Sequence, residues 1–206
     1  MITFQQTMDM VNTIKYIYHE KGYEFFERGD DDINLIGIRH SLDIPNKYTD
    51  TGLMVWRNVY KEWQMFQFEM TTTPGEYYRL NPINELGTGI IVEGQHKNLF
   101  IKGKHRRLNA LVQYSDVPVY RDNNKDLAID KEKIMIAPAT SGFNFHGITN
   151  ENLEFPTEIG KFSAGCQVVP DRAKYNLIIS LCYRGMKKYG GVMTYTILDE
   201  VDFRGI

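Results

Sequence analysis

Short alternating segments separated by turn residues follow Gly52, and they constrain the fold more than any other feature of the sequence. Residues 53–59 and 63–70 are predicted to form a hairpin, with Trp63 on one face of the second strand and Phe66 on the other. Further short strands are predicted at residues 33–38, 89–93, 99–102, 110–114, 117–121, 133–137, 143–146 and 192–198. So many short strands predict a mainly β fold.

Two segments have the periodicity of α-helices. Residues 7–22 repeat apolar side chains at intervals of three and four, and Gly22 is the predicted stop. Residues 171–189 have Asp171 as the predicted N-cap and two lysines in the last turn, where positive charge suits the helix dipole. The sequence therefore predicts a mainly β protein with two helices, built as a small barrel or sandwich.

A loop predicts a boundary near residue 50. Residues 41–50 contain Pro45, Asn46 and two aspartates, a composition that is typical of turns. We expect residues 1–50 to form an N-terminal helical extension with a linker or docking role. Residues 51–206 are expected to form the main domain, since 206 residues suit one domain with a small appendage.

Charge and hydropathy argue against several classes of partner. The formal net charge is −2, so we predict no nucleic-acid partner. The one basic cluster, at residues 102–107, is either a solvated hairpin end or a patch for an anionic polymer. No apolar run approaches the roughly 18 residues of a membrane span, so no membrane association is expected. Residues 1–11 lack the features of a Sec signal, which predicts synthesis in the cytoplasm without that export route.

The most informative residues are Phe-His-Gly at 145–147 and Ser-Ala-Gly-Cys at 163–166. A cysteine nucleophile needs a thiolate, and a free thiol with a pKa of ~8.5 is only partly ionised at neutral pH. A neighbouring imidazole such as His146 takes the thiol proton and holds the ion pair. Gly165 permits a tight turn, and the amide of Cys166 suits a developing oxyanion. On chemistry alone, unrelated core roles for His146 and Cys166 remain the alternative.

These residues resemble the signature of the L,D-transpeptidase catalytic domain, also called the YkuD domain. In that signature a catalytic His is followed, after an interval like the one here, by Ser or Thr, His, Gly and Cys. The resemblance implies that His146 is the general base, Ser163 the Ser/Thr position, Gly165 the glycine and Cys166 the nucleophile. It is strong over residues 143–169 and weaker over the rest of the main domain. It implies a β-sandwich or barrel with one helix after the catalytic cysteine.

The chain departs from that signature at Ala164, where the family has a second His. An alanine cannot form a side-chain hydrogen bond, so the orienting role of that His is absent or supplied elsewhere, for example by His105. Gln167 and Val168 also differ from the residues usual after the cysteine. Four stretches resemble phage-encoded members of the superfamily, namely residues 34–40, 71–75, 87–89 and 119–123. That likeness implies a virion-associated or lytic enzyme of the cell wall, with phage tail or virion proteins as partners.

Peptidoglycan stem peptides are the substrate that the resemblance implies, with no cofactor. The candidate substrate-binding residues are His105, Arg121, Gly147 and Thr73. Three of them have a simpler interpretation: His105 as a surface histidine, Arg121 as part of a local ion pair at a strand end, and Thr73 as an ordinary strand threonine. No metal site is predicted, because Cys-x-x-Cys and His-Glu-x-x-His patterns are missing from the sequence. Cys182 is expected to be a structural residue on the second helix.

The family resemblance predicts an L,D-transpeptidase or L,D-carboxypeptidase or endopeptidase that works through a thioester on Cys166. The alternative is a phage structural or wall-binding module on the same fold, with little or no turnover. Ala164 favours that alternative, whereas the presence of both His146 and Cys166 favours the enzyme.

Overall fold

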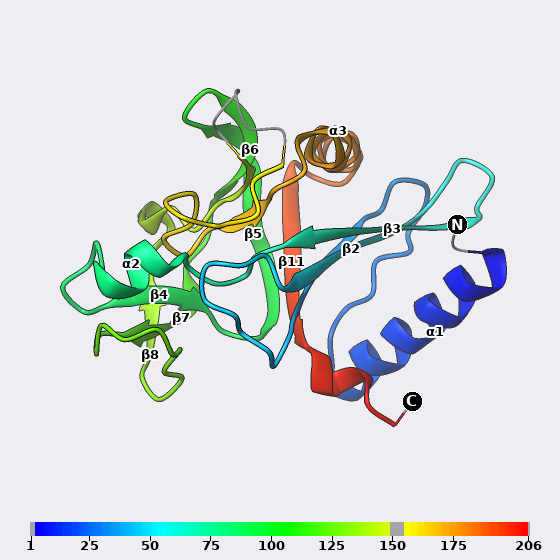
Figure 1. The fold of residues 1–206 in the computed structure, drawn as a ribbon. Coiled ribbons are helices and arrows are strands. Elements are labelled where there is room, and N and C mark those ends of the chain that lie inside the picture. Colours follow the sequence, from blue (N-terminus) through cyan, green and yellow to red (C-terminus); the bar gives the residue numbers. More distant parts are fainter. Residues whose placement is uncertain (1–2, 149–154, 206) are drawn as a thin grey trace.

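An eight-stranded sheet is the framework of the chain in the computed structural model, which describes residues 3–148 and 155–205 (Figure 1). In spatial order its strands are β10 (Gln167–Val169), β9 (Phe145–Gly147), β6 (Leu108–Gln113), β5 (Gly94–His105), β11 (Val192–Asp199), β1 (Asn34–Arg39), β2 (Asp50–Arg57) and β3 (Trp63–Met70). Just beyond β3, the amide and carbonyl of Thr71 bond Val168 in β10, at 2.9 and 3.1 Å. This pair of bonds nearly closes the sheet into a barrel, which confirms the mainly β prediction.

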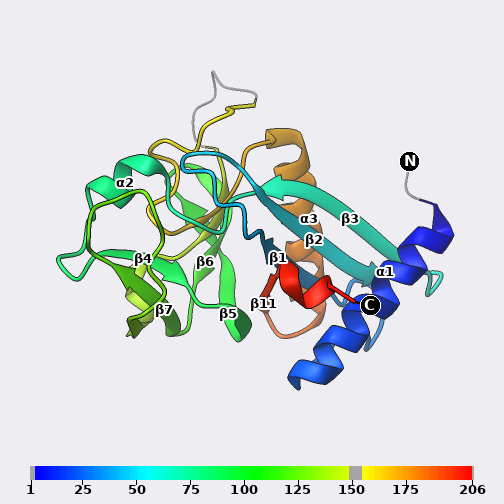
Figure 2. The ribbon, with the colours of Figure 1, turned by 60° about the horizontal axis from the view of Figure 1, so that its bottom comes forward.

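A smaller sheet of three antiparallel strands lies at the end of the molecule away from α1 (Figures 1 and 2). Its strands are β4 (Thr88–Ile91), β7 (Val117–Asp122) and β8 (Ile134–Ala137), in the order β4-β7-β8. The short helix α2 (Glu76–Leu80) lies beside this sheet (Figure 1). Two 3-10 turns, η1 (Ala139–Ser141) and η2 (Glu200–Phe203), complete the described elements.

Both predicted helices are confirmed, with small differences at their ends. Helix α1 (Phe4–Lys21) begins at a capping box between Thr3 and Gln6 and ends at Gly22, which adopts the left-handed conformation. Helix α3 (Arg172–Lys188) is capped by the Asp171 side chain, as predicted. The expected number of two helices was too low, because α2 is only five residues long and shows no helical periodicity in the sequence.

The two faces of β3 belong to two separate apolar clusters. Trp63 and Met65 pack with the buried face of α1, whereas Phe66 and Phe68 belong to the core that also contains α3. This alternation is the one predicted from the sequence, because successive side chains of a strand point to opposite faces.

The first fifty residues, expected as an N-terminal extension, supply an internal strand of the large sheet. Strand β1 lies between β11, with which it pairs in parallel, and β2, with which it pairs antiparallel. Residue 50 itself is the first residue of β2. The sequence could not reveal this pairing, since the partner strand β11 lies at the far end of the chain.

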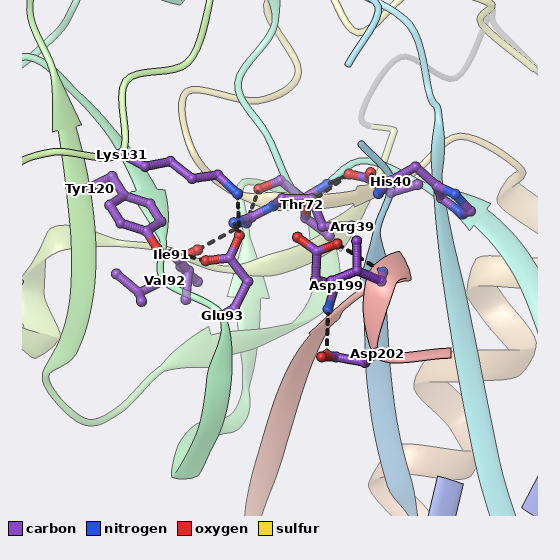
Figure 3. Close-up of polar contacts among 12 residues, drawn as sticks. Arg39, His40, Thr72, Ile91, Val92, Glu93, Tyr120, Lys131, Asp199 and Asp202 are labelled. Atoms are coloured by element: carbon purple, nitrogen blue, oxygen red, sulfur yellow. Dashed lines mark hydrogen bonds and ion pairs between the residues drawn. The ribbon is translucent and has the colours of Figure 1, made fainter. Parts of the chain in front are cut away.

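A network of charged and polar side chains around the buried Arg39 joins the two sheets (Figure 3). Arg39, at the end of β1, donates to a carboxylate oxygen of Glu93 at 2.7 Å and to the Ile91 carbonyl at 2.9 Å. The Tyr120 hydroxyl and the Lys131 ammonium also donate to Glu93, at 2.8 and 2.7 Å. Burial alone raises the pKa of Glu93, but Arg39 and the hydrogen bond from Lys131 outweigh it and lower the pKa to about 2.

Within the described residues, the helices are all too short or too polar to cross a membrane.

Candidate active site

Strands β9 and β10 bring the predicted nucleophile and base to one face of the sheet. They pair in parallel with Phe145 opposite Gln167. These two side chains point inward, since Phe145 packs against Tyr195 and the Tyr195 hydroxyl donates to Gln167 Oε1 at 2.9 Å. His146 follows Phe145 and Cys166 precedes Gln167, so the alternation of side chains directs His146 and Cys166 to the opposite face. Part of the interval between the two signature segments, residues 149–154, lies outside the described residues.

The Ser163 hydroxyl shapes the turn that carries Cys166. Its oxygen accepts a hydrogen bond from the Gly165 amide at 3.1 Å, and it lies 2.8 Å from the Cys166 carbonyl oxygen, to which it donates. The Ser163 carbonyl accepts from the Gly75 amide at 3.0 Å, which fixes the turn to the loop after β3. Ser163 is therefore a positioning residue for the turn, as local hydroxyl–backbone bonds commonly are.

Gly165 is the residue of this turn that tolerates no side chain. Its φ of +128° is rarely adopted by other residues. A Cβ atom at this position would lie 2.5 Å from the Gly89 carbonyl oxygen and 2.6 Å from the Phe143 ring. The tight turn predicted before Cys166 is thus present, and it packs directly on β4.

The thiol of Cys166 is partly enclosed and neutral in this structure. Its sulfur donates to the Gly142 carbonyl at 3.3 Å. Burial raises the pKa of Cys166 to about 11, although a backbone hydrogen bond from Asn144 acts in the opposite direction. The expected resting thiolate–imidazolium pair is therefore not favoured, because desolvation penalises both of its charges.

His146 is held as a neutral imidazole with one basic nitrogen available. Its Nδ1–H donates to the Gly147 carbonyl at 2.7 Å. Its Nε2 is buried and has no hydrogen-bond partner among residues 3–148 and 155–205. Burial, together with nearby His105 and Arg106, lowers the pKa of His146 to about 3. This tautomer leaves the Nε2 lone pair free, which is the form that a general base requires.

The His105 ring lies on the His146 ring. The two planes are inclined by 2° and the centroids are 3.9 Å apart. Asn144 donates from Nδ2 to Nδ1 of His105 at 3.2 Å, while its Oδ1 accepts from the Gln113 amide at 2.9 Å. Because a backbone amide is always a donor, the Gln113 contact fixes the orientation of Asn144. Nδ1 of His105 is therefore an acceptor.

A cavity of about 350 Å³ opens beside Cys166. Its lining includes His105 and three cationic side chains, Arg106, Arg121 and Lys161, and no carboxylate among the described residues. Cavities lined by charge of one sign attract ligands of the opposite sign. The arrangement therefore suits an anionic ligand whose reactive group meets the thiol.

Arg121 is a half-buried cation of this cavity whose guanidinium is only partly hydrogen-bonded. Its Nη1 donates to the Gly87 carbonyl at 3.1 Å, while its buried Nε has no partner within the described part of the chain. Burial lowers the pKa of Arg121. A guanidinium with free donors is well suited to bind a carboxylate.

The basic cluster at residues 102–107 forms the end of the β5–β6 hairpin. Arg106 occupies its turn with a φ of +54°. Within the cluster, Lys104 and Arg107 are exposed, whereas His105 and Arg106 line the cavity.

Two predicted substrate-binding residues lie elsewhere. Thr73 is buried, and its Oγ1 accepts from Arg79 at 3.2 Å; it lines a different cavity, which it shares with Arg39. Gly147 is also buried, and a Cβ there would lie 2.6 Å from the Tyr175 ring. The Gly147 carbonyl thus accepts the hydrogen bond from Nδ1–H of His146, and the absence of a side chain lets Gly147 pack under α3.

Sequence reasoning missed Asn144 and Lys161, which the fold brings to the site. Asn144 precedes β9, and its role depends on the neighbouring hairpin. Lys161 lies in a loop without a motif, and its ammonium stacks 3.9 Å from the Tyr77 ring centroid. Of the two, only Asn144 could have been suggested by the sequence, because it lies two residues before His146.

The site has no features of a metal centre, since the described residues contain no group of three or more His, Cys, Asp or Glu side chains placed to hold a metal ion. Comparison with family models, curated proteins and solved structures gave no match. Inference about function therefore depends on the site geometry and on the likeness of its residues to the L,D-transpeptidase signature.

Proposed function

We propose that the chain is a cysteine acyl-transfer enzyme of the L,D-transpeptidase type, acting on peptidoglycan stem peptides. One observation carries the proposal. Cys166 lines a cavity that also contains cationic side chains, and His146, whose Nε2 is free, lies on the neighbouring strand β9. A buried structural cysteine has no need of either feature.

In the proposed reaction, Nε2 of His146 removes the thiol proton as the sulfur attacks a carbonyl carbon of the stem. The attacked bond joins the L-centre of a diaminopimelate-type residue to the terminal D-residue. Because the thiol and the imidazole are both neutral at rest, proton transfer accompanies attack rather than preceding it. The Cys166 amide, which bonds no acceptor within the described residues, is available to the oxyanion.

Collapse of the tetrahedral intermediate expels the amine of the D-residue, which takes the proton from His146. A thioester on Cys166 remains. Attack by an amine acceptor then gives a cross-link, and attack by water gives carboxypeptidase or endopeptidase activity.

Substrate recognition is assigned to the cations of the cavity. Stem peptides carry carboxylates, and Arg121 has donors free to bind one. His105 and Arg106 lie on the hairpin side of the same cavity. Likeness to phage-encoded members supports a virion-associated or lytic role at the cell wall, with tail or virion proteins as further partners.

The test uses Gram-negative sacculi incubated with wild type, Cys166→Ala and, as a matched thiol control, Cys182→Ala. Released and remodelled muropeptides are read by mass spectrometry. The proposal expects loss of a terminal D-residue, or new or broken cross-links, with wild type and Cys182→Ala only. Equal products from all three folded proteins would refute acyl transfer through Cys166.

A second candidate is a wall-binding or virion module with little turnover. Ala164 favours it, because this residue lines the cavity at the position where the family has its second His. Binding of the Cys166→Ala protein to sacculi, without any change in muropeptides by wild type, is the result expected of such a module.

A further inference from the structure

His105 is a titratable residue in direct contact with the proposed base, and the proposed function leaves its stacked geometry unexplained. The centroids are 3.9 Å apart and the ring planes are inclined by 2°, so the two imidazole rings are stacked in parallel. Stacked rings cannot exchange a proton through their faces, since the ring nitrogens donate and accept in the ring plane. The effect of His105 on His146 is therefore electrostatic and steric.

The contacts of His105 favour its neutral form. Its Nδ1 faces the amide hydrogens of Asn144, and a proton on Nδ1 would oppose them. Burial and the adjacent Arg106 also lower the pKa of His105. The other titratable or charged groups that face the ring or share its cavity are His146 from β9, Cys166 before β10, Tyr78 from α2, Arg121 from β7 and Lys161 from the loop before Ser163. No carboxylate is among these groups in the described residues, so nothing there offsets a positive charge on His105.

Neutral and protonated His105 act on the base in opposite ways. When His146 takes the thiol proton it becomes a cation, and the face of a neutral aromatic ring attracts a cation. A protonated His105 would instead place a second positive charge against the first, at the contact distance of the rings.

We propose that His105 is a positioning residue for His146: its neutral ring fixes the plane of the base and supports the imidazolium formed during acylation, and its protonation blocks that step. This inference rests on the proposed function. It also assigns a source for the imidazole that this chain lacks at Ala164, because His105 reaches the same cavity from the end of β5.

The experiment compares wild type, His105→Phe and His105→Ala in acylation of Cys166 by p-nitrophenyl acetate, followed across pH by release of nitrophenolate and by protein mass. Phe keeps a flat ring and cannot be protonated, whereas Ala removes the ring. Thermal melts establish that each variant is folded, and NMR of the histidine rings of wild type gives the pH at which His105 titrates.

In wild type, the acid limb of the rate is expected to coincide with the titration of His105. His105→Phe is expected to retain more of the rate at neutral pH than His105→Ala, because it keeps the flat ring, and to move the acid limb to lower pH. His105→Ala is expected to lose roughly 3- to 30-fold in the maximal rate with little change in KM. An unchanged acid limb in His105→Phe, or an unchanged rate in His105→Ala, would overturn the inference.

Failure of the proposed function gives a different result. A wild-type protein that forms no acyl-enzyme at any pH excludes Cys166 as an acylated nucleophile, and the role of His105 falls with it. Acylation by p-nitrophenyl acetate without any action on sacculi rejects the peptidoglycan substrate alone, and the comparison of the His105 variants still holds.

Discussion

Gly165 rests against Gly89: a Cβ atom on Gly165 would lie 2.5 Å from the Gly89 carbonyl oxygen. The contact joins the turn that carries Cys166 to β4 of the small sheet. Position 89 is equally restricted, since a Cβ there would lie 2.4 Å from the Phe143 ring. The nucleophile is thus held at the junction of the two sheets, where a small backbone shift would move the thiol.

Replacing Gly165 with Ala tests this junction. We expect a loss of about 2–5 kcal/mol in the free energy of unfolding, because the substitution adds both backbone strain and overpacking. Gly142→Ala is the matched control: its φ is +79°, yet a Cβ there meets no atom within 4 Å, so only strain of roughly 1–2 kcal/mol is expected. Denaturant unfolding measures both, and equal losses would show that the Gly89 contact is unimportant.

The Cys166 thiol is predicted to react slowly with iodoacetamide at neutral pH. Burial raises its pKa to about 11, above the ~8.5 of a free thiol. The alkylation rate, read by peptide mass, should therefore rise with pH through a midpoint well above that of a model thiol. Cys182 is fully buried in α3, and it should remain unlabelled while the protein is folded. A midpoint below pH 8 for Cys166 would instead indicate a resting thiolate–imidazolium pair.

Arg121 is predicted to bind the substrate carboxylate. Arg121→Gln should raise KM roughly tenfold, which corresponds to the loss of one charge-assisted hydrogen bond. The free energy of unfolding should change by less than about 1 kcal/mol, because no ion pair within the described residues is broken. Arg107→Gln, an exposed change on the neighbouring hairpin, is the control and should leave KM unaltered. An unchanged KM for Arg121→Gln contradicts the assignment.

Local pattern predicted much of the fold. The helix over α1 was predictable from its apolar spacing and Gly22, and the two faces of β3 were predictable from alternation. Helix α2 and strand β10 were not predicted, because each is too short to show a period. The parallel pairing of β1 with β11 also escaped prediction, since no local signal encodes a partner so distant in the chain.

The candidate site was less predictable than the strands that carry it. The motif residues Cys166 and His146 suggested a nucleophile and a base. The elevated pKa of Cys166, however, is caused by burial, and a sequence motif does not reveal burial. Thr73 was expected in the groove, yet its hydroxyl is turned toward Arg79. Stacking of His105 on His146 joins the β5–β6 hairpin to β9, and residue spacing alone cannot predict such a contact.

Glu93 is predicted to make the protein sensitive to acid. Its pKa is about 2 in the folded chain against an ordinary value of 4.5, so the ionised carboxylate stabilises the fold above about pH 4.5. That contribution, on the order of 2 kcal/mol, is lost as pH falls from about 4.5 toward 2. Denaturant unfolding at several pH values measures the loss. In Glu93→Gln the stability at pH 7 should be lower and its fall between pH 4.5 and 2 shallower; an identical slope would exclude Glu93 as the source.

The N-terminal fifty residues are predicted to be required for folding. A chain that starts at residue 52 lacks β1, so β2 and β11 lose their shared neighbour and the large sheet is divided. The buried side chains Leu35 and Ile36 are lost with it. A chain that starts at residue 23 lacks only α1 and its apolar contacts, and it should keep the β signal in circular dichroism with a lower Tm. A cooperative thermal transition in the chain starting at residue 52 would show that β1 is dispensable and that the smaller unit folds alone.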